Sequence, residues 1–116
     1  MDNKDGNIYL IANGDSDLYA IGYTHKKTSE GRIRDLQTGN SMRLTEVEFV
    51  HVNNVVKVAK MVGRYFNDKK ISGIWYDLNS DDVCNFRQIC IEKEGLIKLL
   101  MNNSFFNENC NNDGII

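Results

Sequence analysis

The sequence predicts a single α+β domain, in which a small antiparallel sheet of three strands plus a short edge strand packs against flanking helices. Three kinds of periodicity support this fold class. Two alternating apolar segments enclose a polar turn, a third segment repeats with a period of two, and two longer segments carry apolar residues at helical spacing. In chain order, these segments are 8–12, 18–23, 44–52, 55–66 and 80–102.

The first two segments are typical of a β-hairpin. Ile8 and Leu10 alternate with Tyr9 and Ile11, and side chains at alternate positions of a strand point to opposite faces. The polar run 13–17 supplies turn residues, after which the extended pattern resumes. We therefore expect two adjacent antiparallel strands.

A short helix is predicted next, over residues 29–38, with Ile33 and Leu36 facing the sheet. A hydroxyl side chain at position 28 or 29 can accept a hydrogen bond from an otherwise unpaired backbone N–H at its start. Gly39 then provides the left-handed residue with which many helices end.

The period-two segment 44–52 predicts a third strand, with Leu44, Val47 and Phe49 or their immediate neighbours facing the core. A short edge strand is expected later in the chain, at 74–76, where aromatic and β-branched residues follow a glycine.

Two longer helices are expected, one from position 53 or 54 to about 66 and one over 80–102. The second begins with serine and two aspartates, and acids at a helix start are favoured by the helix dipole. Gly95 is a weak point that could divide it. In the first of these helices, basic residues lie opposite the apolar ones: Lys57, Lys60 and Arg64.

The chain has 116 residues, which fits one domain because domains commonly contain ~100–150 residues. We place this domain at 1–102 and treat 103–116 as an Asn-rich tail. The last helix and the tail are candidate surfaces for homo-oligomer formation. Fifteen asparagines and no proline are typical of an AT-rich genome, viral or microbial.

Several classes of protein are disfavoured by composition. No apolar run approaches the ~18–20 residues of a membrane span, and the N-terminus lacks the apolar core of a signal peptide, so an intracellular protein without a membrane partner is expected. Three cysteines without paired spacing indicate reduced thiols rather than disulfides or a zinc site.

Charge is distributed unevenly along the chain. Residues 24–76 contain ten Lys and Arg against five Asp and Glu, a net charge of +5, whereas the remaining residues carry a net charge of −7. A basic middle region is the kind of asymmetry that local phosphate binding requires. The overall charge of −2 therefore does not argue against a nucleic-acid partner.

Four segments together resemble the GIY-YIG nuclease superfamily, and within it the phage T5 Orf172-like DNA-binding branch. They are the half-motifs at 7–9 and 19–22, Arg32 in the following helix, and the run Leu-Gln-Thr-Gly-Asn at 36–40. The resemblance covers about residues 7–78 and implies a GIY-YIG-like sheet with flanking helices. Two departures are visible, because Asn7 replaces the leading glycine and Ala20 occupies the usual tyrosine position.

The resemblance implies catalytic roles, vestigial or residual, for Tyr9, Tyr19 and Arg32. Other interpretations stay open, since the tyrosines could simply pack in strands and Arg34 could be a solvated helix charge. The expected nucleic-acid-binding residues are Lys26, Lys27, Arg32, Arg34, Lys57, Lys60 and Arg64.

The metal-binding glutamate of the family is missing. Ala59 stands where it belongs, and no Asp or Glu occurs between Phe49 and Asn67. Because Mg²⁺ sites usually need one or two carboxylates, we expect no metal ligands and no cofactor. The sequence thus predicts nucleic-acid binding, to DNA above all, by a degenerate nuclease domain.

Two alternative functions remain. One is an active endonuclease dependent on Mg²⁺ or Mn²⁺, in which a carboxylate from elsewhere restores the metal site. The other is a protein-interaction or self-assembly module that kept the scaffold and lost both activities. Candidates for the restoring carboxylate are Glu46, Glu48 and Asp77.

Overall fold

A five-stranded antiparallel sheet forms the centre of the protein, whose computed structural model describes residues 4–102. The strand order is β3-β1-β2-β5-β4, so the first strand of the chain lies between the second and the third. The strands are β1 (Gly6–Asn13), β2 (Leu18–Thr24), β3 (Leu44–Val52), β4 (Lys70–Ser72) and β5 (Trp75–Asp77). The helices are α1 (Glu30–Gln37), α2 (Val55–Tyr65) and α3 (Ser80–Asn102), with a short 3₁₀ turn, η1 (Asn67–Lys69), after α2.

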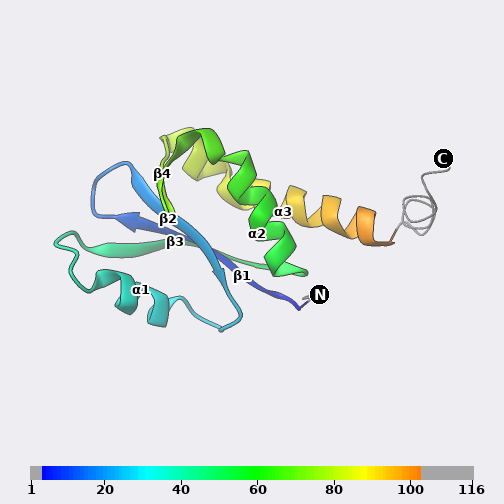
Figure 1. Ribbon diagram of the computed structural model, residues 1–116, viewed down its shortest axis with the longest axis horizontal. Helices are drawn as coiled ribbons and strands as arrows, with labels where there is room; N and C mark the ends of the chain where they lie inside the picture. Colours follow the sequence, from blue (N-terminus) through cyan, green and yellow to red (C-terminus); the bar gives the residue numbers. More distant parts are fainter. Residues whose placement is uncertain (1–3, 103–116) are drawn as a thin grey trace.

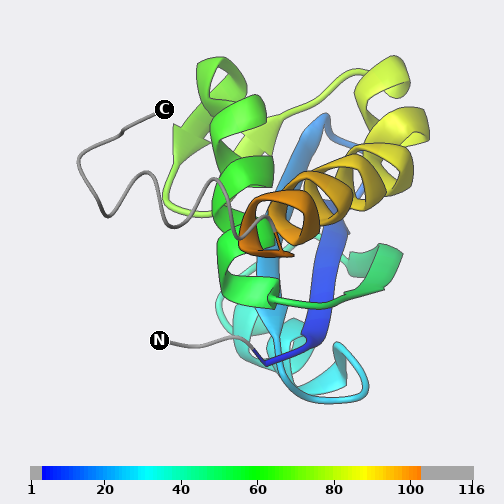
Figure 2. The ribbon, with the colours of Figure 1, turned by 90° about the vertical axis from the view of Figure 1, so that its right-hand side faces the viewer.

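The two faces of the sheet carry different helices. Figures 1 and 2 show α2 and α3 over one face and α1 on the other. Side chains of β1 separate accordingly, since Ile8 and Leu10 belong to the cluster under α2 and α3, whereas Tyr9 and Ile11 belong to a second cluster under α1. Both sides of β1 are therefore buried.

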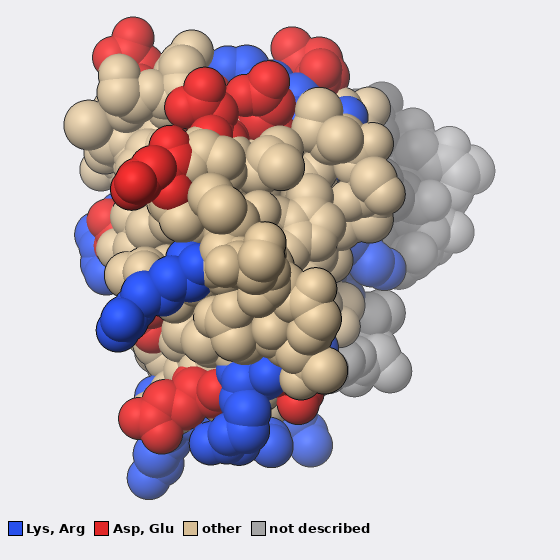
Figure 3. Space-filling model, turned by 90° about the vertical axis from the view of Figure 1, so that its left-hand side faces the viewer, with Lys and Arg blue, Asp and Glu red and all other residues tan. Residues whose placement is uncertain are grey.

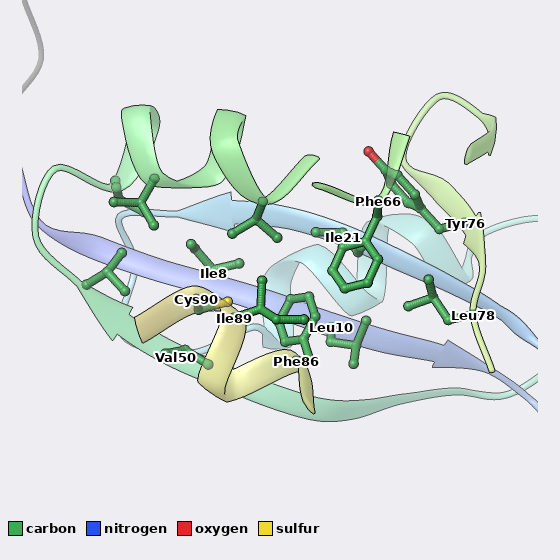
Figure 4. Packing of buried hydrophobic residues seen from close by; sticks show 14 of the residues in the cluster. Ile8, Leu10, Ile21, Val50, Phe66, Tyr76, Leu78, Phe86, Ile89 and Cys90 are labelled. Atoms are coloured by element: carbon green, nitrogen blue, oxygen red, sulfur yellow. The ribbon is translucent and has the colours of Figure 1, made fainter. Parts of the chain in front are cut away.

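The larger cluster is the main hydrophobic core. Val55, Val58 and Val62 recur at helical spacing along α2 and are fully buried. Phe66 and Phe86 stack with ring centroids 6.1 Å apart, which joins the end of α2 to α3 (Figure 4). The predicted α+β class is confirmed by this arrangement of helices on an antiparallel sheet.

The expected sheet was one strand too small. Besides β5, which contains most of the predicted edge strand, the structure has β4, and the two form a hairpin through Gly73 at φ +57°. β4 was missed because all three of its residues are exposed and give no apolar periodicity. Residues Leu18, Tyr19 and Ala20 of β2 pair with β5, which attaches this hairpin to the sheet.

The prediction for β3 was partly wrong. Leu44 is buried and Phe49 packs against the second cluster as expected, but Val47 is 37 % exposed, and Val50 and Val52 reach the main core. The reason is an irregularity in the pairing with β1, where Leu10 lies opposite Glu48 but Ile11 lies opposite Glu46. Val47 is the extra residue, and a bulge of this kind reverses the faces to which later side chains point.

Helix α3 begins at Ser80 as predicted, and a reciprocal cap formed with the preceding residue, Asn79, marks its start. Asn79 Oδ1 accepts a hydrogen bond from the Asp82 N–H at 2.9 Å, and Asp82 Oδ2 accepts one from the Asn79 N–H at 3.0 Å. Asp82 also pairs with Lys69 Nζ, which links η1 to the helix. The helix then runs unbroken through Gly95, so the possible division there is not observed.

Two predictions concern the ends of the chain and the membrane. None of the helices within residues 4–102 is long and apolar enough to cross a bilayer. The Asn-rich tail at 103–116 lies outside the described residues, and so does any contribution it makes to a homo-oligomer.

Replacing the cap residue should weaken α3 measurably. We expect Asn79→Ala to lower the free energy of unfolding by about 1 kcal/mol, because the Asp82 N–H loses its acceptor. Urea denaturation of the purified chain measures this difference. Gln88→Ala, at an exposed site in the same helix, is the control and should change the free energy by less than about 0.5 kcal/mol. Equal effects of the two substitutions would contradict the cap.

The free energy of unfolding should also fall in acid, because the Asp82 carboxylate becomes protonated. Burial by itself raises the pKa of this carboxyl, but the hydrogen bonds from Lys69 and the Asn79 N–H outweigh it, and the net pKa is lowered from 3.8. A group with a lowered folded-state pKa stabilises the fold above its unfolded pKa, and that stability is lost as the pH falls through the folded value. Asp82→Asn should therefore flatten the loss of stability in that acid range, measured by denaturation at a series of pH values.

Candidate nucleic-acid interface

A pocket of about 550 Å³ opens between the end of β2 and the start of α1. Three of the predicted site residues meet there, since Tyr9 of β1, Lys26 of the following loop and Arg32 of α1 all line it. The full lining is Tyr9, Gly22, Tyr23, Thr24, His25, Lys26, Arg32 and Ile74. We call this the phosphate pocket, after the ligand that we propose for it.

Tyr9 forms the buried wall of the phosphate pocket. Its side chain is only 2 % exposed, and burial raises the pKa of its hydroxyl, while the nearby Arg32 guanidinium opposes that rise. Because the net pKa is above the usual value of 10, the hydroxyl keeps its proton at neutral pH. Tyr9 can therefore donate a hydrogen bond but does not act as a phenolate.

Gly22 makes room for the Tyr9 ring. The two residues lie opposite each other in the β1–β2 pairing, and a Cβ added to Gly22 would lie 2.5 Å from Tyr9 Cζ. Gly22 is thus a position of close approach. The group that approaches it is the tyrosine ring itself.

The basic loop after β2 is held by its backbone. The Asn7 side-chain amide donates a hydrogen bond to the Lys26 carbonyl at 2.9 Å, and the Lys26 N–H donates one to Thr24 Oγ1 at 3.1 Å. His25 Nδ1 lies 3.2 Å from the Asp5 carbonyl oxygen. Asn7, which replaces the glycine of the family motif, thus fixes the loop that carries Lys26.

Helix α1 has no fully buried residue. Polar contacts at both of its ends help to position it. At its start the buried Ser29 hydroxyl donates a hydrogen bond to the Glu46 carboxylate. At its end the Gln37 side chain donates to the Met42 carbonyl at 2.8 Å and accepts from the Leu44 N–H at 3.0 Å. These contacts fasten the helix to β3 and fix the place of Arg32.

A second, smaller pocket of about 200 Å³ adjoins the phosphate pocket and shares Thr24, Lys26 and Arg32 with it. This smaller pocket adds Arg34, so three of the predicted basic residues are gathered around one hollow. Its remaining lining residues are Thr28, Gly31 and Asp35. Lys27 belongs to the same exposed loop but lines neither pocket.

Tyr19 is not brought to the phosphate pocket. It packs against the main core on the opposite face of the sheet and pairs with Tyr76 of β5. Ala20, at the motif's tyrosine position, is the residue that shares the Tyr9 face. The sequence analysis missed Tyr23, which lines the pocket from the part of β2 that no longer pairs with β5.

The basic residues of α2 form a separate group, because α2 covers the other face of the sheet (Figure 1). Lys60 lines a pocket that includes Tyr23, whereas Lys57 and Arg64 line neither the phosphate pocket nor its smaller neighbour. The predicted binding set is thus divided into an α1 group and an α2 group.

None of the three carboxylates considered for a metal site lines the phosphate pocket. Glu46 accepts the Ser29 hydrogen bond, Glu48 forms an ion pair with Arg87 of α3 at 3.0 Å, and Asp77 is exposed on β5. Across residues 4–102, no group of three or more His, Cys, Asp or Glu side chains is placed to hold a metal ion.

Charge is separated on the end of the molecule shown in Figure 3. Acidic side chains gather toward the top, and basic side chains predominate at the bottom, the side on which Figure 1 places α1.

No protein-family model, curated protein or solved structure matches the chain. The site is therefore interpreted from its own geometry.

The contact between Gly22 and Tyr9 can be tested by adding one methyl group. We expect Gly22→Ala to lower the free energy of unfolding by about 1–3 kcal/mol, because the new Cβ overlaps the Tyr9 ring. In a Tyr9→Ala background the same substitution should cost less, and a double-mutant cycle followed by urea denaturation measures the difference.

Gly95→Ala is the matched control for this cycle. Apart from its chain neighbours and the nearby backbone of its own helix, no atom of residues 4–102 lies within 4 Å of a Cβ at that position, so the substitution should stabilise the chain by about 0.5–1 kcal/mol. Additive effects of Gly22→Ala and Tyr9→Ala would contradict the contact.

Proposed function

We propose that this chain binds nucleic acid, DNA above all, through the phosphate pocket, as a degenerate nuclease domain of the GIY-YIG type that no longer cuts. The observation that carries the proposal is the convergence of the Tyr9 hydroxyl, Lys26 and Arg32 on one open pocket. These three side chains come from a strand, a loop and a helix, so only the folded chain assembles them.

The chemistry of the pocket suits a phosphodiester. Lys26 and Arg32 bring positive charge and several N–H donors, and charge-assisted hydrogen bonds to phosphate are stronger than neutral ones. The protonated Tyr9 hydroxyl adds a neutral donor at the buried wall. Contacts of this kind position a nucleic-acid backbone without reading its sequence.

Binding without cutting is favoured by what surrounds the phosphate pocket. A hard divalent cation needs carboxylate oxygens, and the lining of this pocket contains no Asp or Glu among the described residues. Lys26 and Arg32 would repel such an ion. With Tyr9 held as a phenol, its oxygen is not an anion that could take a proton from an attacking water.

The resemblance to GIY-YIG domains supports the same proposal. It implies a small antiparallel sheet flanked by helices, with a tyrosine of the first strand close to an arginine of the first helix. The five-stranded sheet and the shared pocket of Tyr9 and Arg32 are compatible with that expectation. Tyr19 and the α2 cations are not part of the proposed pocket.

The dependence of binding on salt tests this proposal. For a duplex, each neutralised phosphate lowers the slope of log K against log [salt] by about 0.9 through counterion release. Lys26→Ala and Arg32→Ala should each weaken duplex binding and make the slope shallower by about that amount. Fluorescence anisotropy of a labelled duplex over a series of salt concentrations provides the measurement.

Lys98→Ala is the control for the loss of one positive charge, because Lys98 lies on α3 in an ion pair with Glu94. It should leave the salt slope unchanged. The absence of binding to duplex and single strand alike, even at low salt, would overturn the proposal in favour of a protein-interaction module. Plasmid nicking with Mg²⁺ or Mn²⁺ that disappears in Tyr9→Phe would show instead that the chain is an active endonuclease.

A further inference from the structure

A third hollow, of about 290 Å³, also lies next to the phosphate pocket and has a mostly apolar lining. The two share Gly22, Tyr23 and Ile74, so they form neighbouring parts of one depression. We call this hollow of about 290 Å³ the apolar pocket. Its complete lining is Ile21, Gly22, Tyr23, Ala59, Lys60, Gly63, Ile74 and Tyr76.

The apolar pocket exists because β5 is short. Pairing between β2 and β5 ends at Ala20 and Trp75, and one further hydrogen bond joins the Ile21 N–H to the Ile74 carbonyl at 3.0 Å. Beyond that point α2 faces β2 with two small residues one turn apart, Ala59 and Gly63. The helix therefore leaves space above the end of β2.

Tyr76 and Tyr23 give this space aromatic surfaces. Tyr76 is largely buried, and Figure 4 shows its hydroxyl oxygen directed away from the core residues. The Tyr76 hydroxyl would lie 3.5 Å from a Cβ at Gly63, which places it against α2. Tyr23 is 39 % exposed and has an edge-on contact with the His25 ring at 6.1 Å. A flat ring entering the pocket would thus meet a partly exposed tyrosine.

We propose that the apolar pocket holds one unpaired base of single-stranded nucleic acid, while a phosphate next to that base occupies the phosphate pocket. This inference rests on the proposed function and adds the kind of strand that is bound. Tyr23 stands where both pockets meet and supplies the stacking surface. Lys60 lies on the α2 side of the apolar pocket and extends the positive charge along the strand.

The preference for a single strand follows from the position of bases in a duplex. A paired base is stacked inside the helix and must be extruded before it can enter a side pocket. An unpaired base needs no such step, and stacking on an aromatic side chain is tolerant of base identity because every base has a π-face. The chain should therefore bind a single strand more tightly than a duplex of equal length.

The test compares an oligothymidylate, an oligouridylate and an abasic deoxyribose-phosphate strand of the same length, each labelled and titrated with the whole chain. We expect the wild type to bind at least one base-bearing strand about fivefold or more tightly than the abasic strand, which is the lower end for a base stacked on an aromatic side chain. Tyr23→Ala should remove this preference, so that its affinities for base-bearing and abasic strands become equal, whereas Tyr23→Phe should keep it.

Tyr65→Ala is the matched control, because Tyr65 is an exposed tyrosine of α2 that does not line the apolar pocket. Gly63→Leu fills the pocket from the helix side and should also abolish the preference without changing the salt slope. Circular dichroism and thermal melting establish that each variant is folded.

Equal wild-type affinity for base-bearing and abasic strands would overturn this inference and leave phosphate binding in place. An equal loss on both kinds of strand in Tyr23→Ala would overturn it as well. If the wild-type chain bound no strand and no duplex at low salt, the proposed function itself would fail. The two failures are therefore distinguishable in one set of titrations.

Discussion

The burial of β1 on both faces is the constraint on which the rest of the structure depends. Ile8 and Leu10 are fully buried on one side, and Tyr9 and Ile11 are buried on the other. A strand that must satisfy two environments has a fixed register, because a slip of one residue would exchange its two faces. The same register sets Tyr9 opposite Gly22 and opens the pocket toward α1.

The main hydrophobic core and the phosphate pocket belong to different layers of the molecule. The face beneath α2 and α3 holds most of the buried apolar side chains and supplies most of the hydrophobic stabilisation. The face beneath α1 has a smaller cluster, and its helix is held by the polar contacts of Ser29 and Gln37 together with the half-buried Ile33 and Leu36. No residue of the phosphate-pocket lining belongs to the main core.

Much of the fold could be predicted from the sequence, and the failures have physical causes. Helical periodicity located α2 and α3, and alternation located the three long strands, because those segments bury one or both faces. β4 was missed since it is wholly exposed, and Val47 was placed wrongly since a bulge leaves no trace in apolar spacing. In the candidate site, three of the predicted residues, Tyr9, Lys26 and Arg32, line one pocket. Strict alternation along β2 could have excluded Tyr19 from the pocket, because Tyr19 and Gly22 are an odd number of positions apart and so point to opposite faces of the sheet. Tyr23 reaches the pocket because β5 ends before it.

The bulge at Val47 also bears on self-association. β3 is nine residues long and forms one border of the sheet, and a long regular border strand invites pairing with strands of other molecules. An extra residue in the middle breaks the spacing of its outward N–H and C=O groups and increases the local twist. Glu46 and Glu48, directed to opposite faces around that residue, add negative charge on both sides. The irregularity that orients Glu46 toward Ser29 thus also makes this border a poor template for aggregation.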